Sequence, residues 1–260
     1  MKLILEQFEK SYSKYNQLLI AVSGGVDSMT LGYVAHKIFS QTKIYHAISP
    51  AVPDDATHRV KAYADKHAWN LVLINAGEFD DVTYVNNPVN RCFYCKTNLY
   101  KAISEKEKGV ICSGANLDDL SDYRPGLDAA KLFHVEHPWI TLGVNKEQIR
   151  HLANYFGLSD IEDLPASPCL SSRVETGIRI FPETLSLISQ CESAIKTMIE
   201  VHTVRCRVQK EKITIELDKR TLEKLKEIER KNIKSLANNL FGDNCSIFID
   251  YYKRGSAFLR

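Results

Sequence analysis

Apolar runs alternate with amphipathic stretches along the first two-thirds of the chain. Runs with the length and composition of buried strands lie at 18–22, 43–48, 71–74 and 110–113. Stretches with helical spacing of apolar residues lie at 28–39, 54–69 and 146–156. A capping box formed by Asn145 and Gln148 is expected to begin the last of these helices. Strands that alternate with helices in this way predict an α/β fold with a parallel sheet.

The pattern changes beyond about residue 181. Helical spacing is found at 183–199 and 222–240, and strand-like runs lie at 201–209, 213–217 and 246–251. This order predicts a smaller α+β domain. We therefore expect a first domain over 1–180 and a C-terminal domain over 181–260. Polar, turn-rich segments predict loops at 77–91, 114–126 and 159–176.

Composition and charge indicate a globular protein that is neither secreted nor embedded in a membrane. The 260 residues are 44% hydrophobic, enough for a full core, and the net charge of +2 gives no electrostatic case for bulk binding to nucleic acid. The first 16 residues are rich in charge and lack the apolar centre of a signal peptide. No apolar run reaches membrane-spanning length. We expect a cytoplasmic protein that does not enter a membrane.

The most informative segment follows the first predicted strand. Residues 18–28 read LLIAVSGGVDS, so an apolar strand leads directly into two glycines and the start of a helix. Glycines let the backbone approach a charged group closely, and helix N-terminal amides attract anions. This predicts a phosphate-binding loop; the alternative is a turn that only connects strand and helix. A Walker loop is excluded because Asp27 stands where that motif needs a lysine.

Seven cysteines are spread unevenly along the chain, and an expected cytoplasmic location makes disulfides improbable. We interpret four of them as structural: Cys112, Cys191, Cys206 and Cys245. Cys92 and Cys95 form a CxxC pair, which by itself fits a zinc site, a redox pair or coincidence. Cys169 lies in the predicted loop 159–176, close in sequence to Arg173, a cation that would lower the thiol pKa if the two side chains were adjacent.

Several of these motifs resemble known families. SGGVDS is similar to the pyrophosphate loop of the PP-loop ATP pyrophosphatases (adenine nucleotide alpha hydrolase-like enzymes), which cleave ATP to AMP and pyrophosphate. Blocks at 87–96 (NPVNRCFYCK), 113–126 (SGANLDDLSDYRPG) and 164–173 (LPASPCLSSR) resemble the LarE family, as do VRCRV at 204–208 and YKRGS at 252–256. LarE proteins are ATP-dependent sulfur transferases that build the nickel-pincer nucleotide cofactor of lactate racemase.

The resemblance implies a nucleotide site in the first domain. The residues implied to bind the pyrophosphate part of ATP, with Mg²⁺, are Ser23, Gly24, Gly25, Asp27 and Ser28. Asn116 and Asp118 become candidate nucleotide or metal partners, and Arg124 a second phosphate contact. For Asp119 and Asp122 the preferred interpretation is a role in turns.

The resemblance also implies the sulfur chemistry. The enzyme would adenylate a carboxylate of a pyridinium dicarboxylate mononucleotide, and sulfur from Cys169 would then displace AMP. Cys92, Cys95 and Cys169 match the family's three-cysteine pattern, which holds a 4Fe-4S cluster and uses a sulfide or other sulfur donor. Sacrifice of the Cys169 sulfur and a zinc site on the same thiolates remain alternatives.

The C-terminal domain is implied to take part in binding or transfer. Arg205 and Arg207 alternate along a predicted strand and so share one face. The resemblance makes them candidates for binding the substrate phosphate or aiding sulfur transfer, whereas alone they would indicate an exposed polar face. Glu216 and Arg254 are weaker candidates of the same kind. The family also suggests a homo-oligomer.

Three other functions fit parts of the pattern. A tRNA thiolase of the PP-loop superfamily also combines the loop with cysteines but needs an RNA-binding surface. An amidating ligase similar to NAD or GMP synthetases would use ammonia and give the cysteines no role. A nucleotide-sensing module would bind ATP without turnover.

Overall fold

The computed structural model describes residues 1–121, 124–242 and 245–253 and divides the chain into two compact units. The first unit contains residues 1–81 and 90–167, and the second contains 82–89 and the chain from Pro168 onward. The segment 168–180 therefore groups with the second unit, whereas the sequence pattern assigned it to the first domain. Asp122 and Arg254, singled out from the sequence, lie outside the described residues.

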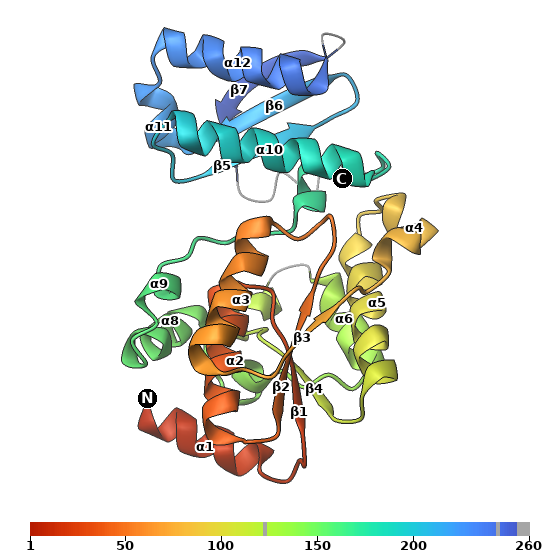
Figure 1. The fold of residues 1–260 in the computed structure, drawn as a ribbon, viewed down its shortest axis with the longest axis vertical. Helices are drawn as coiled ribbons and strands as arrows, with labels where there is room; N and C mark the ends of the chain where they lie inside the picture. Colours follow the sequence, from red (N-terminus) through yellow and green to blue (C-terminus); the bar gives the residue numbers. More distant parts are fainter. Residues whose placement is uncertain (122–123, 243–244, 254–260) are drawn as a thin grey trace. The chain divides into compact units, whose positions relative to one another are not determined.

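A four-stranded, fully parallel sheet forms the centre of the first unit (Figure 1). Its strands are β1 (Leu18–Ala21), β2 (Thr42–Ala47), β3 (Leu71–Ile74) and β4 (Val110–Ser113). They stand in the order β3-β2-β1-β4, so β1 lies inside the sheet and pairs with β2 and β4. The predicted α/β class with a parallel sheet is confirmed.

Helices cover both faces of this sheet. The helices of the first unit are α1 (Lys2–Tyr12), α2 (Val26–Ile38), α3 (Asp54–His67), α5 (Arg91–Lys106), α6 (Pro125–Leu132), α7 (Pro138–Thr141), α8 (Lys146–Tyr155) and α9 (Ser159–Glu162), with 3-10 turns η1 (Glu78–Asp80) and η2 (Leu117–Ser121). Along β1, Leu18 and Ile20 join one apolar cluster, whereas Leu19 and Ala21 join another. Alternate strand positions point to opposite faces, so both faces of β1 are buried.

All three predicted loops contain helical structure, and 114–126 includes the 3-10 turn η2 and the first residues of α6. The segment 77–91 includes η1 and α4 (Val82–Val85), and α5 begins at Arg91. Cys92 and Cys95 therefore lie in the first turns of the helix that follows this segment. The segment 159–176 likewise contains α9 and the 3-10 turn η3 (Leu170–Arg173). The predicted capping box of α8 is present, with the Asn145 side chain accepting from the Gln148 amide.

The second unit is built on a three-stranded sheet. Its elements are α10 (Pro182–Met198), β5 (Val204–Val208), β6 (Lys212–Leu217), α11 (Lys219–Lys224), α12 (Glu227–Phe241) and β7 (Ser246–Tyr251). β5 and β6 are antiparallel, and β6 and β7 are parallel. The single helix predicted over 222–240 is interrupted, because Leu225 is extended and a new helix begins at Glu227, where the Lys226 amide donates to Glu229 Oε2 at 2.8 Å.

The short segment 82–89 is fastened to the second unit by a buried amide. Asn87 is fully buried, and its Nδ2 donates to the carbonyl oxygens of Glu175 and Ile178 at 2.9 and 3.0 Å. Tyr84 makes a hydroxyl–hydroxyl hydrogen bond of 2.7 Å with Ser171. Throughout the described ranges, no helix is both long and apolar enough to cross a membrane.

Candidate functional site

The glycine loop closes on itself at the carboxyl end of β1. The Ser23 amide donates to Ser28 Oγ at 3.0 Å, and this hydroxyl donates in turn to the Gly25 carbonyl at 3.2 Å. Gly24 has φ +86°, and a Cβ there would lie 2.9 Å from both Cβ and the carbonyl oxygen of Ala56. Only glycine fits both the backbone angle and the space. The turn therefore places the first amides of α2 at the edge where open α/β sheets bind ligands.

The loop after β4 packs directly on the glycine loop. A Cβ at Gly114 would lie 2.7 Å from both Cα and the amide nitrogen of Ser28, so only glycine permits this approach. Asn116, two residues later, is 1% exposed. The tertiary fold thus joins SGGVDS at 23–28 to SGAN at 113–116 on neighbouring strands, as the order β1-β4 requires.

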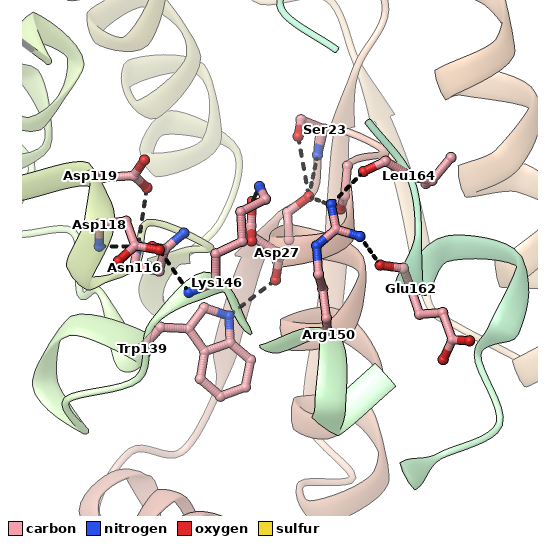
Figure 2. Close-up of polar contacts among 12 residues, drawn as sticks. Ser23, Asp27, Asn116, Asp118, Asp119, Trp139, Lys146, Arg150, Glu162 and Leu164 are labelled. Atoms are coloured by element: carbon pink, nitrogen blue, oxygen red, sulfur yellow. Dashed lines mark hydrogen bonds and ion pairs between the residues drawn. The ribbon is translucent and has the colours of Figure 1, made fainter. Parts of the chain in front are cut away.

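Asp27 lies at the centre of the site (Figure 2). Its Oδ2 is 2.9 Å from Lys146 Nζ, and its main-chain oxygen accepts from the fully buried Trp139 indole at 3.0 Å. The other carboxylate oxygen, Oδ1, is buried and has no hydrogen-bond partner within the described chain. Burial raises the pKa of this carboxyl, and Lys146 opposes that rise. The free oxygen is a fitting ligand for a hard cation such as Mg²⁺.

The acidic loop beside Asp27 is organised by its own side chains. Asn116 Oδ1 accepts from the Asp118 amide at 3.0 Å, and Asp119 Oδ2 accepts from the Asn116 amide at 3.1 Å. Asp118 Oδ2 accepts from the Lys146 amide at 3.1 Å. The interpretation of Asp119 as a turn residue agrees with its bond to Asn116. Arg124 pairs with Asp119 Oδ1 at 2.6 Å and is half-exposed.

Three site residues were not predicted from the sequence. Lys146 and Trp139 contact Asp27, and Arg150 lies one helical turn beyond Lys146 on α8. Arg150 donates to the carbonyl oxygens of Glu162 and of Leu164, the latter at 2.9 Å (Figure 2). The available signal was the spacing of Lys146 and Arg150, which places two cations on one face of the helix predicted at 146–156.

The cysteines differ in burial. Cys112, Cys191 and Cys206 are fully buried, as expected of structural cysteines, whereas Cys92, Cys95, Cys169 and Cys245 are partly exposed. Burial raises the pKa of the Cys112 and Cys206 thiols. Cys92 and Cys95 belong to the first unit and Cys169 to the second, so the three-cysteine set remains a prediction. Among the described residues, no three His, Cys, Asp or Glu side chains gather closely enough to hold a metal ion.

Arg173 holds the backbone around Cys169. Its Nη1 donates to the carbonyl oxygens of Pro168 and Cys169 at 2.6 and 3.1 Å. Its Nε and Nη2 bind the two oxygens of Glu192 at 2.9 and 3.0 Å, and the Arg173 side chain is 2% exposed. The hydrogen bonds of Arg173 therefore fix the main chain at Cys169 and pair with a buried carboxylate.

Arg205 and Arg207 are buried on β5 rather than forming an exposed polar face. Arg207 pairs with Glu216 at 2.9 Å and donates to the Ser172 carbonyl at 2.6 Å, which ties β5 to η3. Arg205 donates to the Val204 carbonyl at 2.7 Å, and burial lowers its pKa. Both arginines are therefore mostly enclosed by the second unit, and Arg207 also lines a cavity there. The sequence could not predict this burial, since alternation shows that two side chains share a face of the strand but not whether another element packs on that face.

A cavity of about 300 Å³ lies beside Arg207 in the second unit. Its walls carry both charge signs, with cations from Arg207, Lys212 and Lys253 and carboxylates from Glu216 and Asp250. Tyr251 adds an aromatic side chain. The cavity thus presents charges of both signs beside an aromatic side chain.

Comparison with known proteins places the chain among relatives without an assigned activity. No family model matches the chain. The uncharacterized protein MJ0830 of Methanocaldococcus jannaschii is 28% identical over 213 residues, which cover 80% of this chain and 81% of that protein. The uncharacterized protein slr1717 of Synechocystis is 32% identical over 218 residues, covering 82% of this chain and 81% of that protein. The chain therefore belongs to the same family as slr1717 of Synechocystis.

Proposed function

We propose that the protein is an ATP-dependent sulfur transferase of the LarE type. Its first unit would act as a PP-loop domain that cleaves ATP to AMP and pyrophosphate. Its acceptor would be a pyridinium dicarboxylate mononucleotide, converted to a thiocarboxylate for a nickel-pincer cofactor. The observation that carries the proposal is Asp27, whose buried Oδ1 is left without a partner in the described chain at the mouth of a closed glycine turn.

The geometry of the glycine loop supports binding of a pyrophosphate. The turn at Gly24 and Gly25 leads directly into the N-terminus of α2, and Lys146 adds a cation beside Asp27. Amides, a helix N-terminus and an ammonium together stabilise a concentrated negative charge. Asp27 Oδ1 would hold Mg²⁺, which would offset the charge that builds on the leaving pyrophosphate. Lys146 would orient Asp27 and contact the phosphate oxygens.

The second unit would supply the acceptor site and the nucleophile. The mixed-charge cavity beside Arg207 suits a nucleotide that carries carboxylates and a phosphate. Arg173 fixes the carbonyl oxygens that flank the Cys169 side chain. In the proposed transfer, the Cys169 sulfur attacks the acyl carbon of the adenylate. The bond from that carbon to the AMP oxygen then breaks, and AMP leaves with the electron pair.

Two sources of sulfur fit the three partly exposed thiols Cys92, Cys95 and Cys169. Together they would hold a 4Fe-4S cluster with one iron open to carry a transferable sulfide, since thiolates are the usual ligands of such clusters. Alternatively, loss of the Cys169 α-proton and cleavage of its Cβ–S bond would release the sulfur to the product and leave dehydroalanine. In place of a cluster, the same three thiolates could instead bind a zinc ion.

The experiment combines intact mass with product analysis. Anaerobically prepared protein reacts with Mg-ATP and the pyridinium carboxylate nucleotide, and AMP and thiolated product are quantified. One product per chain, with loss of the elements of H₂S at Cys169, indicates sacrifice of the sulfur. Unchanged mass with continued turnover when sulfide is supplied indicates the cluster. Amide formation with ammonium that survives Cys169→Ala would refute sulfur transfer, and tight ATP binding without AMP would indicate a sensor.

A second measurement tests the competing tRNA thiolase. Saturable binding of labelled tRNA at physiological salt, together with thiolation of that RNA, would contradict the mononucleotide acceptor. Asp27→Ala and Ser28→Ala should suppress AMP formation and leave any iron content unchanged. The exposed Lys131→Ala is the matched control on the first unit and should retain full AMP formation.

A further inference from the structure

The N-terminal part of α3 packs against the glycine loop. Ala56 lies against Gly24 so closely that a Cβ on Gly24 would approach it to 2.9 Å. One turn further along α3, Arg59 Nη1 donates to the Gly24 carbonyl oxygen at 2.8 Å. The loop between β1 and α2 is therefore held by α3, a helix outside the motif that connects β2 to β3.

The hydrogen bond from Arg59 fixes the direction of a whole peptide unit. In a trans peptide, the carbonyl and the following N–H point to opposite sides of the chain. Because the Gly24 carbonyl points to Arg59, the Gly25 amide must point away from Arg59. A peptide between two glycines rotates more freely than any other, since neither residue has a Cβ to restrict it. Without Arg59, this peptide could turn and present its oxygen to an incoming anion.

The Arg59 guanidinium is not strongly paired with a carboxylate that would compete with the Gly24 carbonyl. Its acidic neighbour Asp55 is 57% exposed at the side chain, and the closest distance between them is 3.8 Å. Such an exposed pair is weak in water. The Arg59 side chain is only 20% exposed, so its bond to Gly24 is partly shielded from solvent and is charge-assisted.

We propose that Arg59 is a positioning residue for phosphate binding. It does not touch the ligand but holds the Gly24–Gly25 peptide with its amide available to the pyrophosphate. The inference rests on the proposed function, because it assumes that the loop binds the phosphates of ATP. It goes further by assigning part of that affinity to α3, a helix outside the motif.

The test measures binding of inorganic pyrophosphate with Mg²⁺ by calorimetry. Arg59→Gln should weaken binding about ten-fold, the loss expected from one charge-assisted hydrogen bond. The matched control is Lys61→Gln, which removes the same charge from an exposed position on the same helix and should bind as the wild type does. In AMP formation, Arg59→Gln should raise KM for ATP and change kcat little, since the lost interaction acts equally in ground and transition states.

The outcomes separate the two ideas. If the wild-type protein does not bind pyrophosphate or ATP, the proposed function fails, and the role of Arg59 fails with it. If the wild type binds and Arg59→Gln binds equally well, the proposed function stands and the inference is wrong. If Arg59→Gln does not fold, as judged by its melting curve, Arg59→Met replaces it because it keeps an aliphatic stem. Wild-type affinity in Arg59→Met would overturn the inference.

Discussion

Lys146 Nζ lies 2.9 Å from Asp27 Oδ2, although the two residues are 119 positions apart in the sequence. The pair joins the first residue of α8 to the first turn of α2. Burial raises the pKa of the Asp27 carboxyl, and the nearby Lys146 ammonium opposes that rise without cancelling it. The protein therefore retains a carboxylate that is costly to bury, at the position where Mg-ATP is proposed to bind.

Asp27→Asn should stabilise the protein at neutral pH and abolish AMP formation. A carboxyl whose pKa is higher in the folded than in the unfolded chain lowers the free energy of unfolding as pH rises through the window between the two values. That window begins at the ordinary pKa of 3.8 and ends at the raised folded value. Melting temperatures of variant and wild type should agree at pH 3 and diverge above it, with the variant higher at pH 7.

A lower melting temperature for Asp27→Asn at pH 7 would contradict this sign. It would mean that the attraction to Lys146 outweighs the cost of burying the carboxylate. Lys146→Met provides the complementary measurement, since it removes the opposing cation and should destabilise the protein at pH 7. Comparing the two variants separates the pair's attraction from the desolvation of Asp27.

Gly114→Ala should damage both the fold and the nucleotide site. The added Cβ would lie 2.7 Å from main-chain atoms of Ser28, so β4 and α2 must move apart. Such overpacking costs about 1–3 kcal/mol in the free energy of unfolding, measured by urea denaturation. Gly25→Ala is the control for stability, because its Cβ would meet only Ser23 Oγ at 3.8 Å. Equal stability of the two variants would show that the loops can separate freely.

Glu192→Ala should be among the more destabilising changes in the second unit. It leaves the Arg173 guanidinium buried and without its bidentate partner, and it removes the acceptor of the Cys206 amide at 2.9 Å. Breaking a buried pair in this way costs about 3–5 kcal/mol. Glu223→Ala breaks the exposed pair with Lys219 and should change the free energy of unfolding by less than about 0.5 kcal/mol. Similar urea midpoints for both variants would refute the assigned role.

Alkylation should divide the seven cysteines into two groups. Iodoacetamide on the native protein should label Cys92, Cys95, Cys169 and Cys245 rapidly, because these four are partly exposed. Cys112, Cys191 and Cys206 should react only after unfolding, since they are buried and burial raises the thiol pKa of Cys112 and Cys206. Peptide mass spectrometry before and after denaturation gives the comparison. Rapid native labelling of Cys112 would contradict the packing of β4.

Local patterns predicted most of the regular elements. The runs at 71–74, 110–113 and 246–251 correspond residue for residue to β3, β4 and β7. α8 begins where its capping box indicated. These elements were predictable because alternating or continuous apolar positions and capping residues act over a few neighbouring residues.

The elements that were missed depend on distant contacts. The buried apolar residues of α5 are Leu99, Tyr100 and Ile103, and all three lie in its second half. The first turns of α5 therefore lack the spacing of apolar residues that predicts a helix. The break between α11 and α12 occurs at Leu225 and Lys226, two residues that favour helices. Leu225 is buried, and its packing overrides that local preference.

The sequence by itself determined the parallel α/β class and the position of a glycine loop after the first strand. It also marked Ser23, Asp27 and Ser28 as the polar residues of that loop. Only the tertiary structure decided the partners of Asp27, because Lys146 and Trp139 reach it through crossovers that bring the end of β4 beside β1. It likewise decided that Arg173, Arg205 and Arg207 are buried. Burial and pairing depend on which chain segments meet in space, and short-range patterns do not carry that information.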